Sequence, residues 1–312
     1  MKPHLLLMAQ NLEPHLGALN DLCEVHHYYN VSDKAALIQE FGEEIKLIGT
    51  NGHIGCSADL MSKLPNLEMI GCFGVGYDAI DTEAARDRGI AVTNTPDVLN
   101  DAVAELGLGL MISLARKIPQ SDQYVRKGHW LDGDMPLTVE LSGKTAGIVG
   151  LGRIGKELAS RLQAMKMRVV YHGRNQQPNL PFEYYDDVTA MAQAVDWLVV
   201  SLPGGSDTDG IISAEVLDAL GPDGYFVNVA RGSVVDEDAL CERITSGKIA
   251  GAALDVFAGE PKVPASLLQA ENVVLSPHAA SATTKTRHDM AELVIKNMLA
   301  QVENRPLLTR VV

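Results

Sequence analysis

Short apolar runs alternate with amphipathic stretches along almost the whole chain, and this alternation is typical of α/β proteins with parallel sheets. In the first part of the chain, the apolar runs predict strands at Leu5–Met8, Lys46–Thr50, Met69–Phe73 and Ile90–Thr93. A longer helix is expected over Val98–Ala115, because Val103, Leu106, Leu110 and Leu114 recur on one helical face. These elements predict a first parallel sheet followed by a connecting helix.

A second series of alternating elements begins at Lys144. Its expected strands are Thr145–Val149, Met167–Tyr171, Trp197–Leu202, Tyr225–Val229, Ala252–Val256 and Val273–Ser276. A final amphipathic helix over Lys285–Glu303 lies too far along the chain to join this sheet, so we expect it to return to the first. The predicted fold class is α/β, with two Rossmann-like or flavodoxin-like doubly wound parallel-sheet domains and a cleft between them. Residues 1–97 with 287–312 form the first expected domain, and residues 98–286 form the second.

The composition supports two folded domains and limits their partners. The 312 residues are 46% hydrophobic, which suffices for two buried cores. Acidic residues number 40 and basic residues 26, which gives a net charge of −14. No basic patch stands out in the sequence, so neither nucleic acid nor an anionic membrane is an expected partner.

Signals for targeting and for metal binding are weak. The apolar run near Leu5 is shorter than a signal-peptide core, and no stretch reaches the roughly 18 apolar residues of a membrane span. The four cysteines, Cys23, Cys56, Cys72 and Cys241, form no CxxC pair and no metal-ligand spacing. We therefore expect a cytoplasmic protein with reduced thiols and no bound metal.

The sharpest local motif is a glycine-rich loop, Gly150-Leu151-Gly152-Arg153-Ile154-Gly155. It follows an expected strand and opens an expected helix, and this context is typical of the dinucleotide-binding fingerprint. The first glycine allows a tight turn, the second admits the pyrophosphate, and the third lets the helix pack closely on the strand. The alternative is a tight turn that binds nothing. We assign dinucleotide binding to the second domain and substrate binding to the first.

The end of the next strand bears on the choice of cofactor. In an NAD site an acidic residue at this point holds the ribose 2′-hydroxyl, whereas an arginine accommodates the 2′-phosphate of NADP. Here the segment is His172-Gly173-Arg174-Asn175, without an acidic residue. The segment predicts that NADPH is preferred over NADH, which remains possible; the alternative is an ordinary exposed arginine in a turn.

Three polar residues follow strand ends of the second domain: Arg231, Glu260 and His278. Ligands bind at the carboxyl ends of strands in open α/β sheets, so these side chains are candidates to converge there. An arginine, a carboxylate and an imidazole could bind an anionic substrate, orient the imidazole and move a proton. Taken singly, each residue could equally be an ordinary loop side chain.

The segments around these residues resemble the D-isomer-specific 2-hydroxyacid dehydrogenase family. They are Gly74-Val75-Gly76-Tyr77-Asp78, the glycine-rich loop, Asn228-Val229-Ala230-Arg231-Gly232, Asp255-Val256-Phe257-Ala258-Gly259-Glu260-Pro261 and Ser276-Pro277-His278, in the family's order. Within that family the chain looks most like the glyoxylate/hydroxypyruvate reductase branch. It departs from the usual pattern at Ala279-Ala280, where the family has Ile-Gly.

The resemblance implies a role for each matching residue. His278 is the expected acid/base, Glu260 orients its imidazole, and Arg231 binds the substrate carboxylate. The expected cofactor contacts are Val103, Gly150, Gly152, Arg153, Ile154, Gly155, His172, Gly173, Arg174, Asn175, Leu202, Pro203, Thr208, Val229, Ala230, Asp255 and Ala280. The expected substrate contacts are Val75, Gly76, Arg231 and His278, and in a homodimer Trp130 would reach the substrate pocket of the partner subunit. Asn51 is a further candidate, because it ends an expected strand of the first domain.

The resulting hypothesis is an NADPH-dependent reductase of a small 2-ketoacid, such as glyoxylate or hydroxypyruvate, that forms the D-2-hydroxyacid. Hydroxyphenylpyruvate, 2-ketogluconate and phosphite remain open as alternative substrates on the same scaffold. A cofactor-sensing, corepressor-like binding protein remains open as an alternative class.

Overall fold

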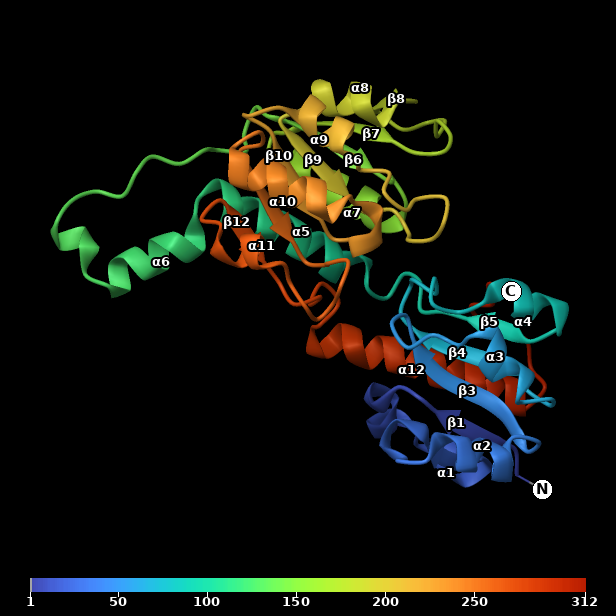
Figure 1. The fold of residues 1–312 in the computed structure, drawn as a ribbon. Coiled ribbons are helices and arrows are strands. Elements are labelled where there is room, and N and C mark those ends of the chain that lie inside the picture. The colour runs from blue at the N-terminus through green and yellow to red at the C-terminus, as the bar shows by residue number, and fades with distance from the viewer. Residues whose placement is uncertain (1) are drawn as a thin grey trace. The chain divides into compact units, whose positions relative to one another are not determined.

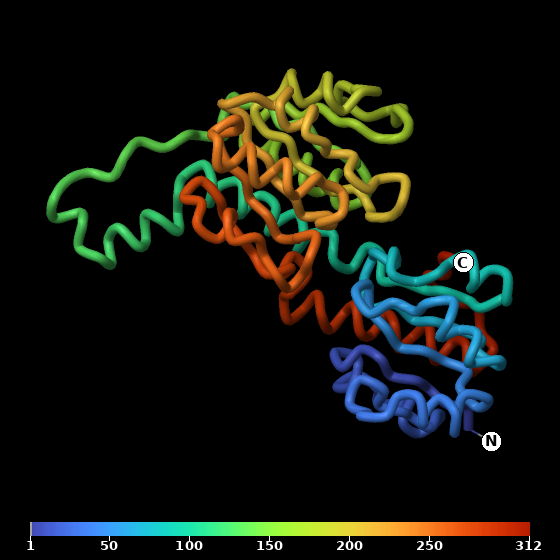
Figure 2. The backbone as a smooth tube through the Cα atoms, in the orientation of Figure 1, coloured from blue at the N-terminus to red at the C-terminus, as the bar shows by residue number. Residues whose placement is uncertain are grey.

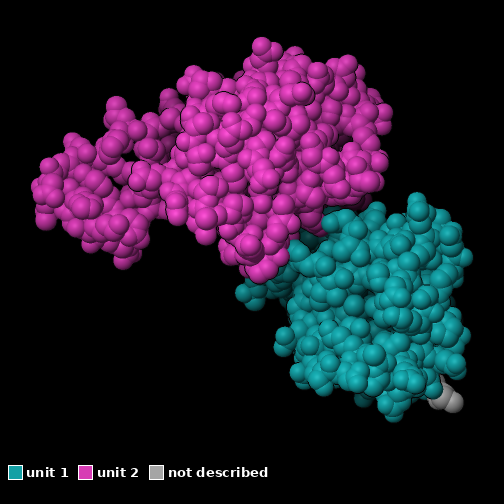
Figure 3. Space-filling model, in the orientation of Figure 1, with its two compact units in different colours: residues 1–99, 283–312 teal, residues 100–282 magenta. Residues whose placement is uncertain are grey.

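The computed structural model describes residues 2–312 of the chain. The chain divides into two compact units, which are coloured separately in Figure 3. Unit 1 comprises residues 1–99 and 283–312, and unit 2 comprises residues 100–282. The domain boundaries expected from the sequence, at 97/98 and 286/287, lie within a few residues of these positions; the separate roles assigned to the two domains stay predictions, as does the cleft.

Unit 1 is built on a five-stranded parallel sheet in the order β2-β1-β3-β4-β5. The strands are β1 (His4–Leu7), β2 (Glu24–His27), β3 (Ile45–Asn51), β4 (Met69–Phe73) and β5 (Ala91–Thr93). The helices are α1 (Ala18–Leu22), α2 (Lys34–Phe41), α3 (Ala58–Ser62), α4 (Thr82–Asp87) and α12 (Thr284–Val302), with short 3₁₀ turns η1 (Gln10–His15) and η2 (Tyr28–Asn30). Figure 1 shows α12, the last helix of the chain, beside the strands of this sheet.

Helix α12 packs on β4 because a glycine in the strand makes room for it. A Cβ atom added at Gly71 would lie 2.8 Å from the Met298 side chain and 3.0 Å from that of Val294. Met298 and Val294 are buried on the face of α12 that contacts the sheet. The amphipathic pattern of the last helix is therefore satisfied within unit 1.

Unit 2 is built on a seven-stranded parallel sheet in the order β12-β11-β10-β9-β6-β7-β8. The strands are β6 (Thr145–Val149), β7 (Arg168–His172), β8 (Glu183–Tyr185), β9 (Trp197–Val200), β10 (Tyr225–Asn228), β11 (Gly251–Leu254) and β12 (Val273–Leu275). The helices are α5 (Asn100–Ala115), α6 (Ile118–Arg126), α7 (Arg153–Ala164), α8 (Val188–Gln193), α9 (Ala214–Leu220), α10 (Glu237–Ser246) and α11 (Ala265–Gln269), with 3₁₀ turns η3 (His129–Leu131) and η4 (Gly232–Val234).

The strand order of unit 2 creates the point at which a doubly wound sheet binds its ligand. The chain enters the sheet at β6, runs outward to β8, and then crosses to β9 on the other side of β6. The loops after β6 and β9 therefore leave the sheet in opposite directions, and in doubly wound sheets ligands bind at the carboxyl ends of such strands. Two parallel α/β sheets confirm the predicted fold class.

Apolar burial and helix caps explain why unit 2 adopts these elements. The central strand β9 is buried along its whole length, as a strand covered on both faces should be. Helices α9 and α10 begin after Ser213 and Asp236, whose side chains accept hydrogen bonds from backbone amides of the first turn. The Arg243 guanidinium of α10 also bonds both carboxylate oxygens of Asp218 on α9, and it lowers the pKa of that carboxyl group.

One part of unit 2 does not pack on the sheet. Helix α6, turn η3 and the segment that follows them project from the rest of the unit as an arm, residues 116–141 (Figures 1 and 2). Neither α6 nor η3 contains a buried residue. The backbone amide of Val139 returns to the Ala115 carbonyl at 3.1 Å and closes the base of the arm. Across residues 2–312, no helix has both the length and the apolar character that a bilayer span requires.

Candidate active site

The loops that carry the predicted site of unit 2 all leave one edge of its sheet, because every strand runs in the same direction. Gly150 follows β6, Gly173 follows β7 and Leu202 follows β9. Farther along the same edge, Arg231 follows β10, while Asp255 and His278 follow β11 and β12. The strand-end rule used on the sequence therefore brings these residues to a common edge.

The three glycines of the loop after β6 have different surroundings. Gly150 has a φ of +96°, and a Cβ atom there would lie 2.7 Å from the Leu202 backbone. A Cβ atom at Gly155 would lie 2.4 Å from the Gly150 carbonyl oxygen, so the helix can approach only without a side chain. Gly152 has open space around it instead. The first and third glycines permit close packing, and the second leaves room for a ligand.

Helix α7 supplies donors to this space. Its N-cap is Gly152, and no side chain in the described part of the chain caps its first turn. Backbone amides at a helix N-terminus attract anions through their hydrogen atoms and through the helix dipole. Arg153 and Ile154 form the first turn, as predicted. This arrangement fits the pyrophosphate of a dinucleotide. The glycine-rich loop also lies between a strand and a helix, which is the context that a dinucleotide-binding motif requires.

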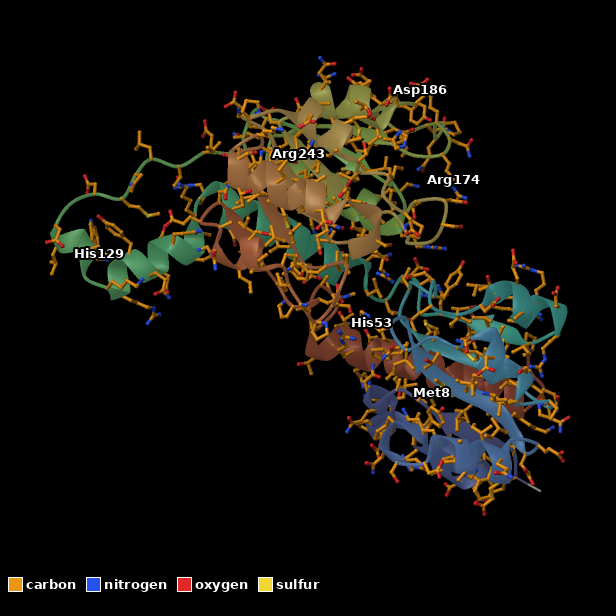
Figure 4. The ribbon with its side chains drawn as sticks, in the orientation of Figure 1. Met8, His53, His129, Arg174, Asp186 and Arg243 are labelled. Carbon is orange, nitrogen blue, oxygen red and sulfur yellow. The ribbon has the colours of Figure 1, made fainter. Side chains whose placement is uncertain are left out.

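The loop after β7 presents the residues expected near the adenosine ribose. His172 ends the strand, and its Nδ1 lies 3.0 Å from the Tyr185 carbonyl oxygen. A Cβ atom at Gly173 would meet nothing within 4 Å, so there is space beside this backbone. Arg174, which is labelled in Figure 4, and its neighbour Asn175 are both exposed. Within residues 2–312, no hydrogen bond or ion pair engages the Arg174 side chain, which leaves its guanidinium available to an anion.

The other predicted cofactor residues line the neighbouring strand ends. Thr208 closes the loop after β9 by donating its hydroxyl to the carbonyl oxygens of Pro203 at 2.9 Å and Gly205 at 3.0 Å. Leu202 is buried against Gly150. Val103 on α5 is buried too, as are Val229 and Ala230 after β10. Their contacts with a cofactor stay predictions.

Arg231 stands on a turn that buried polar groups define. The side-chain amide of Asn228 donates to the Arg231 carbonyl at 2.8 Å and its oxygen accepts from the Ala230 amide at 3.0 Å. Asn228 is fully buried, so these hydrogen bonds replace those it would make to water. A Cβ atom at Gly232 would lie 2.0 Å from the Phe257 backbone. Gly232 therefore lets the turn that carries Arg231 touch the segment that leads to Glu260.

Glu260 and His278 form a direct pair. The imidazole Nδ1 donates to Glu260 Oε2 at 2.8 Å, while Glu260 Oε1 accepts from the Phe257 amide at 2.9 Å. Both side chains are partly exposed. With Nδ1 directed to the carboxylate, Nε2 is the ring nitrogen on the side away from Glu260. A carboxylate in this position fixes the imidazole and stabilises its protonated form.

The backbone at His278 is held in a conformation that few side chains adopt. Its φ is +51°, in the left-handed region that costs free energy for residues other than glycine. Asp255, which is fully buried, holds the turn: its carboxylate accepts from the Ser276 hydroxyl at 2.5 Å and from the Ala279 and Ala280 amides at 2.8 and 3.0 Å. The Asp255 carbonyl also accepts from the His278 amide at 2.8 Å.

This finding adds a role to one predicted residue. Asp255 was expected to bind the cofactor, and the structure shows that its carboxylate also holds the His278 turn. Its contact with a cofactor stays a prediction, as does that of Ala280, whose amide joins the same turn. Ala280 stands where the family has glycine, and its amide still bonds Asp255.

The predicted substrate residues of unit 1 lie at or just after strand ends: Asn51 ends β3, and Val75 and Gly76 follow β4. The carbonyls of Val75 and Gly76 accept from the Asn94 amide at 2.9 Å and the Cys72 thiol at 3.5 Å. No backbone acceptor within residues 2–312 engages the amides of Val75 and Gly76, so these amides suit an anion. The Asn51 oxygen accepts from the His53 and Ile54 amides and shapes its own turn. Substrate binding by Asn51, Val75 and Gly76 stays a prediction.

Three residues that help to build the site were not assigned a role from the sequence. They are Asn228, Gly232 and Ser276, which shape or contact the segments that carry Arg231 and His278. All three residues stand in matched motifs, and their presence there was the available signal. The contact of Ser276 with Asp255 joins residues that follow different strands, so no local pattern predicts it.

Comparisons with known proteins agree with this geometry. Residues 108–280 match the family described as D-isomer specific 2-hydroxyacid dehydrogenase, NAD binding domain. The chain is 43% identical over 285 residues to glyoxylate/hydroxypyruvate reductase A HPR2 of Arabidopsis thaliana, covering 91% of each chain. It is 45% identical over 270 residues to hydroxyphenylpyruvate reductase of Plectranthus scutellarioides, covering 86% of each.

A solved structure extends the similarity to the fold of the whole chain. The NADPH-dependent glyoxylate/hydroxypyruvate reductase of Sinorhizobium meliloti, solved with NADP and malonate, superimposes with a TM-score of 0.91 at 39% identity. The match covers 100% of this chain and 97% of that one. Together with the dinucleotide loop and the paired imidazole and carboxylate, these similarities show that the chain is an oxidoreductase that belongs to the D-isomer-specific 2-hydroxyacid dehydrogenase family.

Proposed function

We propose that this protein reduces a small, unphosphorylated 2-ketoacid to the D-2-hydroxyacid with NADPH, and that glyoxylate and hydroxypyruvate are its best substrates. The observation that carries the proposal is the His278–Glu260 pair, 2.8 Å apart, on the sheet edge that also bears Arg231 and the glycine-rich loop. The relatives named for glyoxylate and hydroxypyruvate reduction support the substrate class.

Each residue has a distinct task in this reaction. The Arg231 guanidinium binds the substrate carboxylate and polarises the neighbouring carbonyl group. His278 gives a proton from Nε2 to the carbonyl oxygen as the alkoxide charge develops. Glu260 stabilises the imidazolium before the transfer and keeps Nε2 toward the substrate. A reduced nicotinamide, when bound, supplies the hydride.

The loops of unit 1 limit the substrate in this proposal. The amides of Val75 and Gly76 suit a carboxylate, and the segment Gly74–Asp78 has no cluster of cations for a phosphate. We therefore expect hydroxypyruvate to be reduced more efficiently than its phosphorylated form.

A substrate panel tests the reaction. The purified protein is assayed with glyoxylate, hydroxypyruvate, phosphohydroxypyruvate, phenylpyruvate, 2-ketogluconate and phosphite, each with both nicotinamide cofactors. The proposal expects the highest kcat/KM with glyoxylate or hydroxypyruvate and NADPH. Preference for phosphohydroxypyruvate or an aromatic or sugar ketoacid would overturn the substrate assignment. Turnover of phosphite alone, or cofactor binding without turnover, would overturn the reaction itself.

Arg174 carries the proposed preference for NADPH. The 2′-phosphate has nearly two negative charges, and the exposed Arg174 guanidinium can pair with it while Gly173 leaves room. A hydrogen bond to a charged group contributes about 1.5–3 kcal/mol, so we expect NADPH to exceed NADH by at least about tenfold in kcat/KM. The relative solved with NADP supports this choice.

Two variants test the preference. Arg174→Ala should remove most of it, and the double variant Gly173→Asp/Arg174→Ala should favour NADH, because a carboxylate there accepts from the ribose hydroxyls and repels the phosphate. Equal kcat/KM for both cofactors in the unmodified protein would contradict the proposal.

We also infer that the protein is a cytoplasmic homodimer that uses the arm as its interface. Trp130, Leu131 and Leu137 are 65%, 94% and 98% exposed on this arm, although large apolar side chains favour burial. A partner subunit would cover them, and Trp130 is proposed to reach the partner's substrate pocket. A monomeric mass by light scattering at micromolar concentration would contradict the dimer.

A further inference from the structure

The loop that carries Arg174 is anchored at both ends by tyrosine hydroxyl groups. The Tyr184 hydroxyl donates to the Gly173 carbonyl at 3.0 Å, and the Gln177 amide donates to the Tyr171 hydroxyl at 2.7 Å. Tyr171 belongs to β7 and Tyr184 to β8, and their rings pack 5.3 Å apart. Because Tyr171 is buried, its hydroxyl is a fixed point for the loop. The exposed residues Arg174 and Asn175 lie between these two anchors.

The side chain of Gln177 also contacts a residue outside this loop. Its side-chain amide donates to the Leu151 carbonyl at 2.7 Å. Leu151 is buried between Gly150 and Gly152, inside the glycine-rich loop. Gln177 is itself half-buried, whereas its neighbour Gln176 is exposed. A single side chain thus joins the loop that suits the pyrophosphate to the loop that carries Arg174.

We propose that Gln177 is a positioning residue for cofactor discrimination: it holds the Arg174 loop at a fixed distance from the glycine-rich loop before the cofactor binds. This inference rests on the proposed function, in which Arg174 pairs with the 2′-phosphate. A pre-ordered loop avoids the entropy cost of ordering on binding. The pyrophosphate is common to both cofactors, whereas the 2′-phosphate occurs in NADPH alone. A loosened loop should therefore weaken the binding of NADPH more than the binding of NADH.

The test replaces Gln177 by a side chain of similar length that cannot donate. Gln177→Met should raise the Kd of NADPH about fivefold, which is the size expected for one lost hydrogen bond, and that of NADH by less than about twofold. The kcat at saturating NADPH should stay unchanged, so the loss appears in KM. Binding is measured by fluorescence titration. Gln176→Met, one residue away and exposed, is the matched control and should change neither value.

Two further variants distinguish positioning from a general structural effect. Tyr184→Phe removes the hydroxyl of the other anchor but keeps the ring packing. It should also weaken the binding of NADPH more than the binding of NADH. In the Arg174→Ala background, Gln177→Met should raise the Kd of NADPH by no more than it raises the Kd of NADH. The contact of Arg174 with the 2′-phosphate is already absent there, so Gln177 has nothing left to position. A full additional fivefold loss there would contradict positioning of Arg174.

Hydrogen exchange in the cofactor-free protein tests the anchoring without any activity readout. Amides of residues 173–177 should exchange faster in Gln177→Met than in the unmodified protein, and Gln176→Met should leave them unchanged. Unchanged exchange together with unchanged NADPH affinity in Gln177→Met would overturn the inference. Equal affinity of the unmodified protein for NADPH and NADH would instead overturn the proposed preference, and with it a role in discrimination, while exchange still decides whether Gln177 anchors the loop.

Discussion

The turn that carries His278 and the arm formed by residues 116–141 both belong to unit 2, and they are stabilised in opposite ways. The His278 turn surrounds a fully buried carboxylate, Asp255, that accepts hydrogen bonds from one hydroxyl and two amides. The arm has no buried residue in its helix and instead exposes Leu131 and Leu137 almost completely.

We propose that this difference reflects two roles: the His278 turn carries the chemistry, and the arm forms the interface of the dimer. A residue with an unfavourable φ, such as His278, persists only when its surroundings fix it, and Asp255 does so within one unit. The arm has few contacts of its own, among them the Tyr124 hydroxyl bonded to the Gly133 carbonyl at 2.9 Å. Unit 2 buries Leu141 at the base of the arm but leaves Trp130, Leu131 and Leu137 exposed.

The largest expected effect comes from removing the imidazole. His278→Ala should lower kcat by about 10²–10⁴-fold, the usual contribution of general acid catalysis, while NADPH still binds with nearly unchanged affinity. The matched control is His129→Ala on the arm (Figure 4), which should retain kcat. Steady-state kinetics and fluorescence titration measure both. Near-normal turnover in His278→Ala would remove this residue from the mechanism.

The arm provides the next largest effect. Leu131→Asp combined with Leu137→Asp places two charges on the proposed interface, and it should raise the dimer dissociation constant by at least about 30-fold, as for a loss of 2 kcal/mol or more. Sedimentation or light scattering measures the change. The circular dichroism spectrum should stay unchanged, because neither leucine is buried within its own subunit. A dimer of unaltered affinity would show that the arm is not the interface.

Asp255→Asn tests the support of the His278 turn. An amide NH₂ replaces one acceptor oxygen and faces a backbone donor, so we expect a loss of about 1–3 kcal/mol in the free energy of unfolding. The melting temperature should fall by several degrees and kcat should fall with it. Asp186→Asn, an exposed residue of the same unit (Figure 4), should change neither. If Asp255→Asn melted like the unmodified protein, the buried carboxylate would not hold the turn.

The smallest predicted effect concerns the carboxylate partner of the imidazole. Glu260→Gln leaves an oxygen for the Phe257 amide but removes the negative charge that stabilises the imidazolium. A neutral amide accepts this hydrogen bond less strongly than a carboxylate does, so the imidazole is held less firmly and kcat should fall by about tenfold, equivalent to roughly 1.4 kcal/mol. Steady-state kinetics measure the change. A kcat equal to that of the unmodified protein would contradict the role of Glu260.

Sequence patterns located the buried strands better than the edge strands. Met69–Phe73 and Thr145–Val149 were predicted at their observed bounds, because strands covered on both faces are continuous apolar runs. Among the edge strands, the mostly buried Ala91–Thr93 and Val273–Leu275 were also predicted, within one residue, whereas the more exposed Glu24–His27 and Glu183–Tyr185 were not. An edge strand can keep polar side chains, so its sequence lacks the apolar run that identifies a central strand.

In the candidate site, too, local patterns identified some residues, whereas contacts between distant segments were not predicted. Arg231, Glu260 and His278 were identified because each follows a strand, and parallel strands bring such residues to one edge. The anchoring of His278 by Asp255 was not foreseen, since it depends on where the Ala279 and Ala280 amides point. The link from Gln177 to Leu151 spans loops after different strands and has no local pattern either.

The contrast between the His278 turn and the arm is tested most directly by single-turnover reduction of hydroxypyruvate in two variants preloaded with NADPH. One variant is His278→Ala and the other is Leu131→Asp/Leu137→Asp, and NADPH oxidation is followed by stopped-flow absorbance at saturating hydroxypyruvate. We predict that the first variant is a dimer that transfers hydride at least about 10²-fold more slowly than the unmodified protein. The second should be a monomer whose rate stays within about tenfold of the unmodified protein. Equal loss of hydride transfer in both variants would contradict the claim that the chemistry is built by unit 2 and the assembly by the arm.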